Sequence, residues 1–367
     1  MSSPRAAFWA LVRMPARLAF RRSLNRRSFS LPVGAPRLSY GGVLPRTPDV
    51  IVAGGRVKLK ELDRVFPESE SFNLLYLVSS ALPAHAPELV RWARSRGARL
   101  VWNQNGVAFP AWAGSRCAET NEPLAELRKL ADFVIYQSEF CRVSADRFLG
   151  PVSSSSRVLF NPVDLAAFSP ALDPAPAKPW RLLTAGTHYQ PWRVIGPLEV
   201  LARLRDAGHA VHLTIAGELR WPGAQSEVQE VVSRLHVADS VSFRPAFTQA
   251  EAVAMYRAAH LLLHPKYHDP CPTVVIEALA CGVPVIGSRS GGMPELVGED
   301  GGELIDVPLS WEKPSAPDPK RVAEAVVRLT DDWPAHSRAA RTRAERLFAA
   351  ETWVAEHRRI FEQVLAA

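Results

Sequence analysis

The sequence lacks the features of several common protein classes. It has no stretch of about 18 uncharged apolar residues, which argues against a membrane-spanning helix. No strand-to-helix turn carries G-x-G-x-x-G, which argues against a dehydrogenase. The four cysteines form no C-x-x-C pair and match no common zinc or disulfide framework, so we expect free thiols in a reducing compartment.

Acidic residues are absent from the first part of the chain. Residues 1–47 contain nine arginines and no Asp or Glu. Subtracting these nine charges from the net charge of +7 leaves −2 for residues 48–367, and a nearly neutral body argues against a broad nucleic-acid-binding face. We expect a basic, disordered arm over residues 1–47. An organelle-targeting leader and a patch that contacts anionic lipid head groups remain open alternatives.

What the chain does contain is two series of alternating strands and helices. Near-continuous apolar runs are typical of parallel strands that are covered on both faces. Residues 170–180 hold four prolines and no periodicity, which indicates a linker between the series. The strands expected before the linker are 50–53, 73–79, 99–102, 133–137 and 158–160, and those after it are 181–185, 211–216, 241–243, 261–264 and 285–288.

This order predicts an α/β fold of two Rossmann-like, doubly wound domains that face each other across a cleft. The expected boundaries are 48–169 for the first domain and 181–345 for the second. We expect the last helix, 346–367, to pack back on the first domain, with Trp353, Ile360, Phe361 and Val364 as its packing residues.

The segment from 264 to 295 carries the clearest chemistry. A strand ends at its start, and a helix is expected to begin near Pro272, because proline suits the first helical position. The amides of Thr273, Val274 and Val275 should then be free, and a helix start with free amides attracts phosphate. Glu277 lies about one turn further on, where a carboxylate can receive ribose hydroxyls.

Asp269 and Glu277 are separated by seven residues and followed by A-L-A-C-G-V-P-V-I-G-S and G-G-M-P-E. This pattern resembles the Glu-x7-Glu region of the retaining glycosyltransferases of the GT-B fold known as group 1 or family 4. The resemblance covers about residues 48–367. It implies that Glu277 grips the ribose of the donor and that Asp269 lies beside the transferred sugar. Asp269 departs from the family, which has the longer glutamate there.

A second part of the resemblance concerns the diphosphate of the donor. The strand R-L-L-T-A-G ends at Gly186, where the family often carries an arginine and then a lysine five or six residues later. Here Thr187 takes the place of the arginine and Arg193 that of the lysine, as a guanidinium that can bind two phosphate oxygens. His188 is a candidate replacement for the missing cation.

The first domain offers fewer signals. Gly54 and Gly55 are similar to the family's glycine turn facing the donor phosphates, where backbone can approach a ligand without a Cβ. Asn103, Asn105 and Gly106 follow the third expected strand. They are candidates for holding acceptor hydroxyls, with an ordinary Asn-Gly turn as the equal alternative.

The resemblance implies a metal-independent transferase that moves a sugar from a nucleotide-diphosphate sugar to a hydroxyl of a glycan, a glycolipid or a cell-envelope polysaccharide intermediate. It implies no metal and no cofactor, since the nucleotide sugar is a substrate. We expect a cytoplasmic protein, with the basic arm as a candidate contact to the inner face of a membrane. A nucleotide-sugar epimerase and a non-catalytic nucleotide-sugar-binding protein of polysaccharide assembly remain the alternatives.

Overall fold

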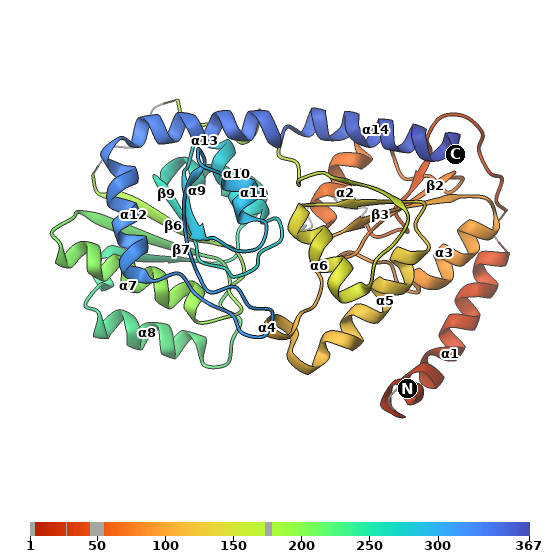
Figure 1. Ribbon diagram of the computed structural model, residues 1–367, viewed down its shortest axis with the longest axis horizontal. Coiled ribbons are helices and arrows are strands. Elements are labelled where there is room, and N and C mark those ends of the chain that lie inside the picture. Colours follow the sequence, from red (N-terminus) through yellow and green to blue (C-terminus); the bar gives the residue numbers. More distant parts are fainter. Residues whose placement is uncertain (1–3, 27, 45–54, 173–177) are drawn as a thin grey trace.

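The computed structural model describes residues 4–26, 28–44, 55–172 and 178–367 (Figure 1). Two separate parallel sheets are present, with strand orders β1-β2-β3-β4-β5 and β11-β10-β9-β6-β7-β8. Each is covered by helices, which confirms the expected α/β class with two doubly wound units. Among the described helices, none is long and apolar enough to cross a membrane.

The first domain is built around the five-stranded sheet. Its three central strands are buried along nearly their whole length, as expected where apolar runs form parallel strands under helices. The strands are β1 Leu38–Ser39, β2 Leu74–Val78, β3 Arg99–Gln104, β4 Phe133–Tyr136 and β5 Ser155–Val158. The helices are α1 Pro4–Asn25, α2 Gly55–Asp63, α3 Ala86–Ser95, α4 Pro110–Ala113, α5 Cys117–Lys129 and α6 Glu139–Leu149.

The start of the chain differs from the expectation. The strand expected at 50–53 lies outside the described residues, and β1 pairs with β2 instead. Residues 4–25 form a helix that packs on α3, where the charge pattern predicted a disordered arm over residues 1–47. The reason is apolar burial, which counting charges overlooks: Leu24, Leu38 and Tyr40 are completely buried.

The second domain contains the six-stranded sheet. Its helices flank the sheet on both faces (Figure 1). The strands are β6 Trp180–Ala185, β7 Val211–Ala216, β8 Val241–Arg244, β9 Leu261–His264, β10 Val285–Ser288 and β11 Gly302–Ile305. The helices are α7 Trp192–Asp206, α8 Ala224–Arg234, α9 Gln249–Ala258, α10 Thr273–Ala280, α11 Met293–Val297 and α12 Pro319–Asp331.

Two further helices, α13 (Trp333–Leu347) and α14 (Ala350–Ala366), run along the top of both domains in Figure 1. Asp332 caps α13 by accepting from the amide of Ala335. The four packing residues expected on the last helix are buried in one apolar cluster with residues of β2, β3 and β4. Within this cluster the hydroxyl of Tyr76 and Nε2 of His357 lie 3.0 Å apart.

The two domains also meet beneath this helix. Glu295 at the start of α11 accepts hydrogen bonds from the amides of Glu139 and Phe140 at 2.6 and 2.9 Å, which caps α6 from the other domain. We call residues 306–318, between β11 and α12, the strap. The backbone carbonyl of Trp311 in the strap accepts a hydrogen bond from the amide of Ala111 at 2.8 Å, and the ring of Trp311 stacks on Phe140. The strap therefore leaves the second domain, contacts the first and returns.

Candidate functional site

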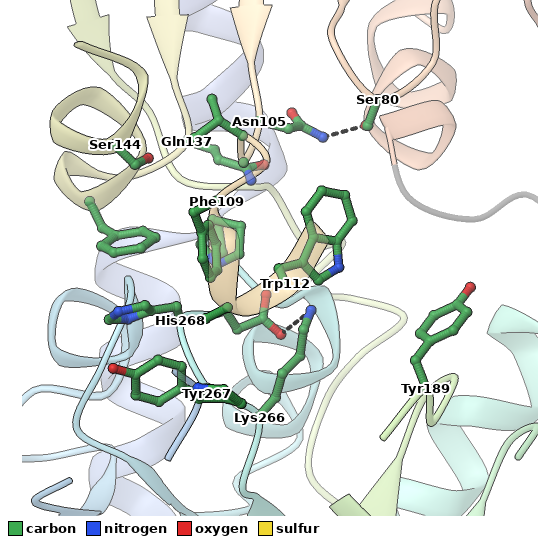
Figure 2. A pocket seen from close by; sticks show the side chains of 18 of the residues that line it. Ser80, Asn105, Phe109, Trp112, Gln137, Ser144, Tyr189, Lys266, Tyr267 and His268 are labelled. Atoms are coloured by element: carbon green, nitrogen blue, oxygen red, sulfur yellow. Dashed lines mark hydrogen bonds and ion pairs between the residues drawn. The ribbon is translucent and has the colours of Figure 1, made fainter. Parts of the chain in front are cut away.

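A cavity of about 400 Å³ lies between the two domains and is lined by residues of both. In Figure 2, Ser80, Asn105, Gln137 and Ser144 lie on one side, and Lys266, Tyr267 and Tyr189 lie across from them. The carboxyl ends of β3, β4, β6 and β9 lead into this cavity. It thus occupies the place where ligands bind in open parallel sheets, as the expected cleft requires.

Asp269 lies at the cavity wall in the loop between β9 and α10. Its Oδ2 accepts from Nε2 of His264 at 3.0 Å and pairs with Nζ of Lys266 at 2.9 Å. Burial acts to raise the pKa of Asp269, but Lys266 and the hydrogen bond from His264 outweigh it and hold the pKa well below its usual value. Asp269 is therefore an ionised carboxylate with a fixed orientation and a poor proton acceptor.

Two glycines hold the backbone of Asp269 in place. Gly291 has φ +65°, and a Cβ there would come within 2.5 Å of the carbonyl oxygen of Asp269. The amide of Gly292 donates to that same carbonyl at 2.9 Å. The G-G-M-P-E sequence therefore supports the acidic residue through close backbone contact that a side chain at position 291 would prevent.

Arg193 reaches the cavity from the first turn of α7. It is 6% exposed, and one of its terminal nitrogens donates to the carbonyl of Thr187. Burial lowers its pKa, which the charge of Asp269 counteracts. Its Nε is buried without a hydrogen-bond partner among the described residues. A buried guanidinium with an unused donor fits the expected contact to an anionic ligand.

The structure corrects the expectation for His188. Its side chain is completely buried, does not line the cavity, and Nε2 lies 3.1 Å from the carbonyl of Ala216. Burial and the nearby Arg193 lower the pKa of His188 to about 4, so it is neutral near pH 7. It therefore cannot supply the missing cation. Gly186 directly follows β6 and has φ +110°. A Cβ built on it would lie 3.8 Å from a terminal nitrogen of Arg193.

The expected phosphate-binding helix is α10, and it begins at Thr273 with Pro272 as its N-cap rather than its first residue. Thr273 lines the cavity. The amide of Val275 donates to the carbonyl of Pro272 at 3.1 Å, so the expectation of three free amides is wrong for this one. Within the described chain, the amides of Thr273 and Val274 have no partner. Two donors thus remain at the helix start.

Glu277 is 6% exposed and does not line the cavity. The hydroxyl of Tyr256 donates to its Oε2 at 3.0 Å. Burial raises the pKa of Glu277 to about 7, although the hydrogen bonds from Tyr256 and Gln249 act to lower it. It lies one helical turn beyond Thr273, as the spacing predicts, but further from the cavity than that residue.

The first domain contributes some, but not all, of the residues that were expected at the site. Gly54 lies outside the described residues, and Gly55 is the buried first residue of α2, with no room for a Cβ beside Ser80. Asn105 and Gly106 line the cavity, whereas Asn103 is buried behind it.

Sequence reasoning missed two residues of this region, Lys58 and Trp311. Lys58 lines the cavity, is 4% exposed and donates to side-chain oxygens of three amides. Helical periodicity could have indicated it, because Leu59 and Leu62 place it on the buried face of α2. Trp311 packs against aromatic rings of the first domain, and its loop sequence carries no such signal.

His260, His264 and His268 are spaced by four in the sequence, but they do not form a common face, because His264 ends β9 and His268 lies in the loop that follows. His264 bonds to Asp269, and His268 packs between Phe140 and Trp311. Among the described residues, no group of three or more His, Cys, Asp or Glu side chains is arranged to hold a metal ion.

Comparison with known proteins finds similarity to one family in the second domain. Residues 176–343 match the family described as "Glycosyl transferases group 1". A D-inositol 3-phosphate glycosyltransferase from Segniliparus rotundus is 33% identical over 161 residues, which are 42% of this chain and 35% of that protein. The same kind of enzyme from Streptomyces bingchenggensis is 44% identical over 81 residues, 22% and 18% of the two chains. The chain thus matches about a third or less of the length of these curated relatives.

Solved structures resemble the whole chain. Sucrose-phosphate synthase from Thermosynechococcus elongatus has a TM-score of 0.66 at 19% identity, covering 90% of this chain and 88% of that one. Anabaena HepE in complex with UDP-glucose has a TM-score of 0.63 at 16% identity, covering 85% and 82%. At such identities the likeness shows the fold alone. Residues 176–343 are therefore similar to the glycosyl transferases of group 1, within a chain that has the two-domain GT-B fold.

Proposed function

We propose that the protein transfers a sugar from a nucleotide-diphosphate sugar to a hydroxyl group of an acceptor, with retention at the anomeric carbon. One observation carries this proposal: a buried Arg193 with an unused donor, the free start of α10 and the ionised Asp269 meet on one wall of the cavity in a group 1 domain. The curated relatives are named as glycosyltransferases, and HepE was solved with UDP-glucose, which supports a donor of this class.

Departure of the leaving group places negative charge on the diphosphate. Arg193 and the amides of Thr273 and Val274 would stabilise that charge as preorganised donors, without a metal ion. Glu277 would receive the ribose hydroxyls, and Gly186 and Thr187 would line the path of the diphosphate. Pro272 and Val275 shape the helix start rather than donate to the ligand.

Asp269 would orient the transferred sugar by accepting hydrogen bonds from its hydroxyls. Its low pKa makes it a poor general base, so the proton of the acceptor hydroxyl would pass to the departing phosphate. The acceptor would be a glycan, a glycolipid or a cell-envelope polysaccharide intermediate that enters from the side of Asn105 and Gly106.

We also propose that α1 contacts the inner face of a membrane when the acceptor is lipid-linked. Arg17, Arg21 and Arg22 are exposed on this helix, which projects from the first domain in Figure 1. Basic surfaces near a membrane attract anionic lipids. Co-sedimentation with vesicles of phosphatidylglycerol, against vesicles of phosphatidylcholine, tests this contact. Equal binding to both would reject it.

Thermal denaturation with UDP, GDP, ADP, CMP and NAD(P) in the presence of EDTA tests the donor site. We expect a shift with one nucleoside diphosphate, which also identifies the base. The corresponding nucleotide sugar should then glycosylate an acceptor, with the anomeric configuration read by NMR. Conversion of the donor alone into an isomer would indicate an epimerase, and binding without any turnover would favour the non-catalytic alternative. A shift with NAD(P) alone would reject the proposal.

A further inference from the structure

A buried lysine lies on the first domain's side of the cavity without a carboxylate beside it. Nζ of Lys58 donates to Oδ1 of Asn103 and Asn105, each at 2.8 Å, and to Oε1 of Gln137 at 3.2 Å. These partners are neutral amides. No described Asp or Glu is among the charges that act on this lysine.

The lysine keeps its charge near neutral pH. Burial lowers the pKa of Lys58 to about 8, which still leaves most of the amine protonated at pH 7. Holding an uncompensated charge in a buried place is costly. A negative group bound in the cavity would compensate it, and this lysine lines that cavity.

The surroundings of Lys58 suit an oxyanion that is attached to a polyol. Asn105 also donates to Oγ of Ser80, and both of these side chains line the cavity (Figure 2). Gly55, the first residue of α2, packs directly beside Ser80. A helix start beside a buried cation is a favourable place for phosphate, and hydroxyl and amide groups bind sugar hydroxyls.

The charged side chains on the second domain's side of the cavity are assigned to the donor rather than to the acceptor. There Lys266 is paired with Asp269, and Arg193 remains beside the start of α10 for the donor diphosphate. Lys58 and Arg193 come from different domains. Of the three cationic side chains that line the cavity, Lys58 and Arg193 form no ion pair with a described carboxylate, and the donor site described above uses Arg193.

We propose that the acceptor of this enzyme carries a phosphate group and that Lys58 binds it. The proposal rests on the transferase function proposed above and names the class of its acceptor: a phosphorylated polyol. A phosphate oxygen would take the place of Gln137, whose bond to Lys58 is the longest of the three. Ser80 and Asn105 would bind the same phosphate or the neighbouring hydroxyls.

Calorimetric titration of the full chain, saturated with the nucleoside diphosphate that binds, tests this assignment. The probes are inositol 1-phosphate, glucose 6-phosphate and glycerol 3-phosphate, each against its unphosphorylated parent. At least one phosphorylated probe should bind at least tenfold more tightly than its parent. Lys58→Met should weaken that binding at least tenfold, and Lys58→Arg should restore part of it. Lys60→Met is the matched control, because Lys60 lies on the same helix and does not line the cavity.

The affinity for the nucleoside diphosphate separates the outcomes. Lys58→Met should change it less than threefold, which also shows that the variant is folded. An equal loss of nucleoside diphosphate and phosphorylated probe would place Lys58 in the donor site and overturn the proposal. Probes that bind no better than their parents, to a wild-type protein that binds its nucleotide, would overturn it as well. A wild-type protein that binds no nucleotide would instead reject the transferase function.

Discussion

At the scale of single residues, the buried carboxylate of Glu277 lowers the free energy of unfolding, and the same carboxylate is expected to bind the donor ribose. Burial raises its pKa from 4.5 to about 7, so the folded protein holds this proton more tightly than the unfolded chain does. The free energy of unfolding therefore falls as the pH rises from about 4.5 to 7, and the cost is fully present above pH 7. A carboxylate retained under such a cost is typical of a functional site.

Glu277→Gln tests both aspects. We expect the variant to gain roughly 3 kcal/mol of stability at pH 8 and little at pH 4.5, because the buried charge is removed. The same variant should bind the nucleoside diphosphate at least tenfold more weakly. Urea denaturation at several pH values and calorimetric titration measure the two effects. Glu324→Gln, at an exposed position of α12, should change neither. Unaltered nucleotide affinity in Glu277→Gln would contradict the ribose assignment.

The residues that sequence reasoning identified and those it missed differ in a physical way. Asp269, Glu277 and Thr273 lie within one continuous segment, so local spacing was enough to place them around one helix start. The role of Lys58 depends on amides from β3 and the end of β4, which only the folded sheet brings together. His188 shows the opposite error, because its polar type suggested a cation and burial makes it neutral.

At the scale of secondary structure elements, the loop after β10 supports the site. Gly291→Ala would place a methyl group 2.5 Å from the carbonyl oxygen of Asp269 in a left-handed backbone conformation. We expect the loop to shift and turnover to fall at least tenfold, with a smaller effect on the nucleoside diphosphate, which lacks the sugar. Steady-state kinetics and titration measure this difference.

Gly196→Ala is the control for this loop. Gly196 lies inside α7, and apart from its chain neighbours and its own helix backbone no atom lies within 4 Å of a built Cβ, so alanine there should keep activity. Normal turnover in Gly291→Ala would show that the loop does not position Asp269.

The predicted bounds of strands and helices are most accurate where the element is buried. β7, β9 and β10 have the predicted bounds, because a buried strand makes an apolar run that ends where the chain leaves the core. β1 was missed, since two residues make no run, and its place in the sheet comes from pairing with β2. The capping box of α9 joins Thr248 and Glu251 within one helical turn, so such a feature can be predicted from local sequence.

At the scale of the whole molecule, α14, the strap and the contact of Glu295 with α6 hold the domains around the cavity. α14 packs its apolar face on the first domain at the top, and the strap inserts Trp311 among Phe109, Phe140 and Phe148 beside the cavity. The strap is anchored at its own domain by Tyr267, whose hydroxyl donates to carbonyls of the strap. Enzymes with a site between two domains often close over a bound ligand, and the strap, which joins the two domains beside the cavity, should favour the closed arrangement.

Trp311→Ala removes this aromatic contact while α14 stays in place. Because each domain keeps its own core, we expect both to remain folded and the population of open molecules to rise. Small-angle X-ray scattering should show a larger radius of gyration without ligand and recovery with the nucleoside diphosphate, whose affinity should fall about threefold to tenfold because closure now costs more. Trp221→Ala, at a half-buried tryptophan bonded to Glu227 within the second domain, should leave scattering and affinity unchanged. Identical scattering of Trp311→Ala and wild type would show that the strap does not set the arrangement of the domains.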